Sequence, residues 1–108
     1  MKAREIISEH EHPSTSWPDI TRLVTLYVDS DDNYAVFVCF SPKGQGGNVD
    51  KVRCYRGRIG PRAEIADPLA AIGSVEDVAQ AVEDEYGAKL AMFFGEPGTD
   101  EPVHWHAH

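Results

Sequence analysis

Three stretches of the chain carry short apolar runs rich in β-branched and aromatic residues, the composition that predicts β-strands. They are residues 20–29, 34–41 and 49–59. The second stretch is apolar on both of its sides, which favours a central position in a sheet. Residues 29–33 (DSDDN) predict a tight turn, because Asp and Asn side chains bond to nearby backbone groups. The glycine-rich segment 42–48 predicts a longer connection between the second and third strands.

Helical spacing of apolar residues is clearest over residues 75–86. One stripe of this segment is apolar and the other residues are mainly acidic. Ser74, followed three residues later by Asp77, fits a capping box, and Gly87 predicts the end of the helix. A short helical segment follows Asp67-Pro68, since Asp favours the N-cap and Pro the first helical position. Residues 3–11 have a weaker apolar stripe, and we interpret them as a further short helix.

The remaining apolar segment, residues 89–94, is interpreted as a fourth strand, and residues 103–108 as a short edge strand. The predicted fold is α+β: an antiparallel sheet of about four strands with one or two helices packed on one face, in the order α-β-β-β-α-β. The predicted core is Val24, Leu26, Val28, Val36, Val38, Phe40, Val52, Val75, Val78, Val82, Leu90, Met92 and Phe94.

Length and composition indicate one domain spanning residues 1–108, with a mobile tail over residues 95–108. No apolar run is long enough for a membrane span, and the N-terminus lacks the apolar stretch of a signal peptide, so we expect a cytoplasmic protein without membrane contact. Cys39 and Cys54 are too few for a disulfide framework and predict buried thiols. The net charge of −8 argues against general binding to nucleic acids.

Positive charge is gathered in residues 43–62, which hold six of the ten Lys and Arg residues and a single acid, Asp50. Arg binds carboxylate and phosphate groups, and Tyr is common at interfaces. The glycine-rich part of this segment lacks the order of residues of a phosphate-binding loop. Three interpretations remain: a solvated strand face, a surface that binds an acidic protein, and a nucleic-acid surface. The candidate partner-binding residues are Lys51, Arg53, Tyr55, Arg56 and Arg58.

The five histidines lie in two clusters with His-x-His spacing, near the two ends of the chain. Residues two apart on a strand point the same way, so such a pair can bind one metal ion. His104, His106 and His108, with His10 or His12, are therefore candidate zinc ligands. A surface tail with incidental histidines is the alternative, because terminal residues are seldom held in place.

No spacing of nucleophile, base and supporting group indicates catalysis, and we interpret the acids of residues 74–86 as a solvated helix face. We therefore expect a non-enzymatic module that binds another protein and needs no cofactor. An inhibitor or immunity-type protein, of the kind that phages and mobile elements encode, is one concrete form. Zinc binding and nucleic-acid binding through residues 43–62 are the alternatives. An exposed edge strand, at residues 20–29 or 89–94, would permit a homodimer.

Overall fold

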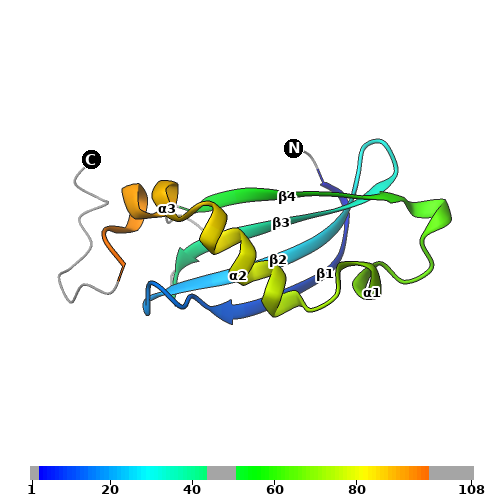
Figure 1. The fold of residues 1–108 in the computed structure, drawn as a ribbon. Coiled ribbons are helices and arrows are strands. Elements are labelled where there is room, and N and C mark those ends of the chain that lie inside the picture. Colours follow the sequence, from blue (N-terminus) through cyan, green and yellow to red (C-terminus); the bar gives the residue numbers. More distant parts are fainter. Residues whose placement is uncertain (1–2, 44–50, 98–108) are drawn as a thin grey trace.

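The structure, a computed structural model, describes residues 3–43 and 51–97, with side chains from residue 5 onward. Four strands come first in the chain and helices follow (Figure 1). The elements are β1 (Ala3–Pro13), β2 (Ile20–Asp29), β3 (Asn33–Pro42), β4 (Val52–Pro61), a 3-10 turn (Arg62–Glu64), α1 (Pro68–Ile72), α2 (Val75–Glu85) and α3 (Gly87–Phe94). The α+β class and the four-stranded antiparallel sheet are confirmed.

The four strands form a meander in the order β1-β2-β3-β4, and each strand is antiparallel to its neighbour. The turn between β2 and β3 is confirmed. The Oδ1 atom of Asp29 accepts hydrogen bonds from the backbone N–H groups of Asp31 and Asn33, at 2.9 and 3.0 Å, and Asp32 has a φ of 63°. In this order β1 and β4 are the two edge strands of the described sheet. The expectation of an edge strand at residues 20–29 is wrong, because β2 pairs with a strand on both sides.

The main core lies between one face of the sheet and helices α2 and α3; in Figure 1, α2 crosses in front of the strands and α3 lies at one end of them. Alternate residues of β2 and β3, including Val24, Val38 and Phe40, are fully buried on this face. Val78 and Val82 of α2 pack against them. The predicted core is therefore correct for these residues, and Val52, Leu90 and Phe94 also belong to it.

The prediction of a helix at residues 3–11 is wrong, because these residues form strand β1. After register shifts between Ala3 and Glu5 and between Ile6 and Ser8, β1 alternates in the manner of a strand: Glu9 and Glu11 lie on one side, and Ser8 and His10 on the other. The apolar stripe of Ala3, Ile6 and Ile7 was too short to stabilise a helix, since most helical stability comes from packing an apolar face. Pairing with β2 instead satisfies the backbone of both strands. The order of elements therefore begins with a strand.

The prediction of a strand at residues 89–94 is also wrong, because these residues belong to α3. The predicted end of the preceding helix is confirmed, since α2 ends at Glu85 with Tyr86 as its C-cap (φ −100°, ψ 14°), but a second helix, α3, begins at Gly87. Leu90 and Phe94, four residues apart, point into the core, whereas Met92 is 78% exposed and does not belong to it. Within residues 3–43 and 51–97, no helix has the length and apolar character needed to span a bilayer.

The predicted helix starts at residues 67 and 74 are confirmed. Asp67 caps α1 by accepting a hydrogen bond from the Ala70 N–H, and Ser74 caps α2 by accepting one from the Asp77 N–H, at 3.3 Å. Replacing Ser74 with alanine should lower the free energy of unfolding by about 1 kcal/mol, because that N–H loses its partner. Urea unfolding of the two proteins measures the difference. Ser74→Asp keeps a capping oxygen and should restore the stability, and an equal loss in both variants would contradict the assignment.

Candidate protein-binding surface

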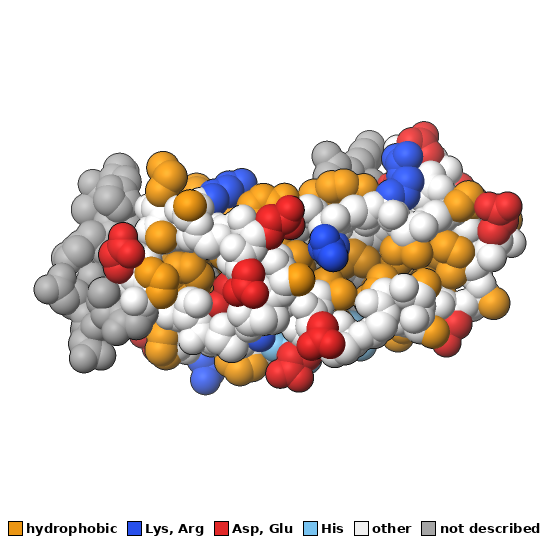
Figure 2. Space-filling model, viewed as in Figure 1, with side chains coloured by type: hydrophobic (Ala, Val, Ile, Leu, Met, Phe, Trp, Pro, Cys, Tyr) orange, Lys and Arg blue, Asp and Glu red, His pale blue; other side chains and the backbone are white. Residues whose placement is uncertain are grey.

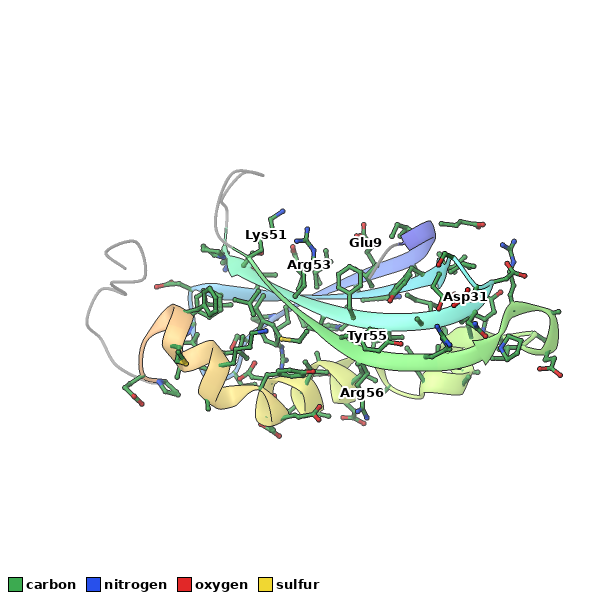
Figure 3. All side chains as sticks on the ribbon, turned by 90° about the horizontal axis from the view of Figure 1, so that it is seen from above. Glu9, Asp31, Lys51, Arg53, Tyr55 and Arg56 are labelled. Carbon is green, nitrogen blue, oxygen red and sulfur yellow. The ribbon has the colours of Figure 1, made fainter. Side chains whose placement is uncertain are left out.

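The face of the sheet opposite the helices, called here the open face, presents the basic residues of β4. Strand alternation directs Val52 and Cys54 toward the core and places Arg53 and Tyr55 on the other side, and Lys51 lies directly before the strand. Figure 3 shows Lys51 and Arg53 projecting from the side of the sheet that faces away from α2 and α3. The Tyr55 side chain is 44% exposed. Three of the five candidate partner-binding residues therefore lie on the same exposed face.

A β-bulge at Arg56 determines where the other two candidates lie. Tyr55 pairs with Phe37 and Gly57 pairs with Val36, so Arg56 is an extra residue in β4. The extra residue shifts the alternation, and Arg58, which pairs with Ala35, returns to the open face. Arg56 lies on the helix side of the sheet (Figure 3). The set predicted from the sequence is therefore divided between two faces.

Some of the basic residues form ion pairs within the chain and others do not. Arg58 binds Asp29 at 3.2 Å and Asp31 at 3.3 Å, and the Arg62 guanidinium binds Glu5 at 3.1 Å. Within residues 3–43 and 51–97, neither Lys51 nor Arg53 has an ion-pair partner within 4.0 Å. The backbone N–H groups of Asn33 and Asp31, together with Arg58, hold the pKa of the Asp29 carboxyl below its usual range. The Asp29–Arg58 pair thus connects the β2–β3 turn to β4, whereas Lys51 and Arg53 form no ion pair with the described residues.

The middle of the open face is apolar and already well covered by neighbouring side chains. Thr25 and Tyr27 of β2 and Cys39 of β3 are buried, although none of the described helices packs on this side of the sheet. The rings of Tyr27 and Phe37 lie 5.4 Å apart. Burial, with smaller contributions from Tyr55 and Asp29, raises the pKa of Tyr27 to about 12. This centre is a rigid apolar floor between two edge strands.

Cys39 lies in this floor, between Leu23 of β2 and Arg53 of β4. Burial raises the pKa of the Cys39 thiol, and the opposing influence of Arg53 and Lys51 does not reverse the shift. A nucleophilic cysteine needs the thiolate form, which a raised pKa disfavours. Cys54, on the core side, is also a free buried thiol with a raised pKa. The prediction of buried thiols is confirmed, and neither cysteine is poised for nucleophilic chemistry.

The opposite edge of the open face is acidic. Glu9 and Glu11 of β1 pair with Thr25 and Leu23 of β2, so both carboxylates lie on the open face, and Glu9 projects from it in Figure 3. Both side chains are exposed. We call Lys51 and Arg53 the basic rim, and Glu9 and Glu11 the acidic rim. The open face therefore has an apolar floor with opposite charges along its two edges.

The helix side has a different character. Figure 2 looks onto the helices and shows acidic side chains scattered over that surface. A cavity of about 280 Å³ lies between β4, α1 and α2. Its lining is mainly apolar and also includes Arg56 and Arg58. The lining residues are Val36, Arg56, Gly57, Arg58, Ile59, Ala71, Ile72 and Val78. Arg56 belongs to this cavity and not to the basic rim.

The helix side also holds a buried polar cluster that the sequence analysis missed. Glu83 was assigned to the solvated face of the helix, yet it is only 2% exposed. Its carboxylate accepts hydrogen bonds from the Ser14 and Thr15 hydroxyls, both at 2.8 Å, and from the Ser16 N–H at 2.9 Å. It also binds the buried Arg22 guanidinium at 3.3 Å. One signal was present in the sequence: Glu83 lies four residues after Ala79, beside the apolar stripe.

The histidine prediction is not tested for the C-terminal cluster, because His104, His106 and His108 lie outside the described residues. His10 and His12 lie on the core side of β1, paired with Val24 and Arg22. Among the residues that the structure describes, no three His, Cys, Asp or Glu side chains are grouped as metal ligands would be. Zinc binding by the C-terminal histidines stays a prediction.

Comparison with known proteins gives no match: no family model, curated protein or solved structure resembles the chain significantly. Function must therefore be inferred from the surface itself.

Proposed function

We propose that the chain is a small non-enzymatic protein-binding module, of an inhibitor or immunity type, that contacts its target through the open face. The observation that carries this proposal is the basic rim. Lys51 and Arg53 have no ion-pair partner in the described part of the chain, and the half-exposed Tyr55 lies beside them on the open face. Aromatic and Arg side chains of this kind are the residues that most often anchor protein interfaces.

The chemistry of the face favours a protein target. An apolar floor beside charged edges matches the general anatomy of an interface, in which an apolar centre is surrounded by a polar rim. A phosphate backbone would meet the two basic residues and also the carboxylates of Glu9 and Glu11 on the same face. Because nucleic-acid affinity depends on neutralising phosphates, this mixed charge favours a protein with an acidic contact patch.

The bulge in β4 supplies a matched test of this proposal. Arg53→Glu and Arg56→Glu are the same change on the same strand, and they alter the net charge equally, but they act on opposite sides of the sheet. A target retained from a lysate of the producing cells by the immobilised wild-type chain should bind Arg53→Glu at least about 10-fold more weakly, because reversing a charge replaces an attraction with a repulsion. Titration of the purified target by calorimetry measures the affinities.

The Arg56→Glu variant should bind that target as the wild type does. If reversal at Arg53 leaves the affinity unchanged, the basic rim is a solvated strand face and the proposal fails. If both reversals weaken binding equally, the effect comes from overall charge and the open face has no special part in it.

A further inference from the structure

The charge pattern of the open face points to a second copy of this chain as a partner. We propose that two copies associate through their open faces, with the acidic rim of each copy lying against the basic rim of the other. The inference rests on the proposed function in one respect, because it takes the open face to be a protein-docking face.

The register defines rows of side chains that run across the open face from β1 to β4. One row is Glu11, Leu23, Cys39 and Arg53, and the next is Glu9, Thr25, Phe37 and Tyr55. Each of these rows begins with a carboxylate and ends with a cationic or phenolic side chain. The apolar floor lies between the two ends.

Two sheets that stack face to face as a symmetric pair are related by a two-fold axis lying between them. If that axis is perpendicular to the strands, β1 lies over β1 and β4 over β4, so the carboxylates of Glu9 and Glu11 meet their own kind. If the axis is parallel to the strands, β1 of each copy lies over β4 of the other. Glu11 then faces Arg53 of the second copy, and Glu9 faces the Tyr55 hydroxyl. Charge complementarity selects the second arrangement.

A dimer formed by pairing the edge strands of two copies is less favourable, because it would bring like charges together. Two β4 strands joined at their edges would bring the basic residues of both copies together, and two β1 strands would do the same with acidic residues. Lys and Arg on an edge strand are a known means of preventing such pairing. Face-to-face packing avoids both conflicts, and it covers the half-buried Leu23 and Phe37 as well.

The area of the face suits a reversible dimer. Four strands spaced ~4.8 Å apart, each of about ten residues rising ~3.3 Å, present roughly 600 Å² per copy. The total of roughly 1,200 Å² is at the lower end of the range for specific interfaces. Each copy carries a net charge of −8, so a general repulsion opposes association, and salt at physiological strength screens it beyond about 8 Å. We therefore expect a dimer in the micromolar range, which a target that binds the same face would displace.

Exchanging the two rim charges tests the arrangement. Within one copy, Glu11 and Arg53 are three strand spacings apart, roughly 14 Å, so they interact little in salt. Between copies they are in contact, twice per dimer. Arg53→Glu and Glu11→Arg should each raise the dimer dissociation constant at least about 10-fold, because like charges then face each other. The double variant E11R/R53E restores opposite charges and should recover dissociation within about 3-fold of the wild type.

Sedimentation velocity over roughly 1 to 300 μM protein, the range in which a micromolar complex dissociates, measures the constants. Arg56→Glu is the control for overall charge and should leave the dimer unchanged. A wild-type chain that stays monomeric throughout, or a double variant no better than either single one, overturns the dimer. These results leave the proposed function standing if the purified target still distinguishes Arg53→Glu from Arg56→Glu. Conversely, recovery by the double variant with no loss of target binding in Arg53→Glu would support the dimer and reject the proposed function.

Discussion

Replacing Glu83 with alanine should lower the free energy of unfolding by about 3–5 kcal/mol, because it leaves the Arg22 guanidinium buried without an opposite charge. Both side chains are almost wholly enclosed, with 1% of the Glu83 side chain and 3% of the Arg22 side chain exposed. The same change removes the acceptor of the Ser14 hydroxyl and one of the two acceptors of the Thr15 hydroxyl, the other being Gln80 Oε1. Since small domains are stable by only about 5–15 kcal/mol, the variant should be close to unfolding at room temperature.

Two control variants separate the charge of Glu83 from its other contacts. Glu83→Gln keeps the length of the side chain and one acceptor oxygen, so its stability should lie between those of the wild type and of Glu83→Ala. Glu85→Ala removes an exposed acid two residues away and should change stability by no more than about 0.5 kcal/mol. Urea unfolding at neutral pH measures all three. Equal effects at positions 83 and 85 would show that the cluster contributes nothing specific.

The Glu83 carboxyl also gives a defined pH dependence. Burial is the largest single influence and raises its pKa, but the hydrogen bonds from Ser16, Ser14 and Thr15 together outweigh it and hold the pKa below its usual range. The ionised group therefore stabilises the fold above the unfolded-state pKa of about 4.3, and this stabilisation disappears as the pH falls through the lower folded-state value. The stability gap between wild type and Glu83→Gln should be constant from pH 7 to about 5 and narrow below about pH 4.3.

The central sheet could be predicted from the sequence because its signals are local. The strand residues of β2 and β3 are β-branched or aromatic, and the Asp-rich turn between them fixes the hairpin. Capping residues Asp67 and Ser74 likewise mark their helices without reference to the rest of the fold. Where short-range chemistry decides an element, the pattern of the chain was sufficient.

The two errors of secondary structure lie where tertiary contacts decide. Strand β1 owes its form to pairing with β2, which a short apolar stripe does not reveal. Helix α3 is an apolar run of eight residues, and such runs do not distinguish a buried strand from a buried helix by their pattern alone. The predicted end of α2 was close to the observed one, but the segment after Gly87 is a second helix, from which Leu90 and Phe94 reach the core.

The candidate surface was found in part for a similar reason. Alternation along the chain predicts that Lys51, Arg53 and Tyr55 share a face; the register agrees for Arg53 and Tyr55, and Lys51 projects from the same side in Figure 3. The position of Arg56 depends on one extra residue in the pairing of β4 with β3, and no residue type in this segment predicts that bulge. The ion pairs of Arg58 and the acidic rim on β1 both join strands that are distant in sequence. Long-range pairing thus determines which of the described basic residues have an ion-pair partner.

Replacing Phe40 with alanine should destabilise the fold much more than replacing Phe37, because these two residues of the same type lie on opposite faces of β3. Phe40 is completely buried in the main core beneath the helices. Phe40→Ala should therefore cost about 3–5 kcal/mol, the range for emptying a large site in a packed core. Phe37 is half-buried on the open face, where its main aromatic contact is Tyr27. Phe37→Ala should cost only about 1 kcal/mol in the monomer, since less apolar surface leaves water there.

Protein concentration makes this comparison a test of both faces at once. The cost of Phe40→Ala should be the same at all concentrations, because its contacts lie within one copy. The cost of Phe37→Ala should rise with concentration if the open face is covered by a second copy, because binding to the folded form adds stability that depends on concentration. Urea unfolding at about 1 and about 100 μM, on either side of a micromolar dissociation constant, measures both. A cost of about 3–5 kcal/mol for Phe37→Ala at the lower concentration would mean that the open face is part of the core of the monomer, and it would then not be a docking surface.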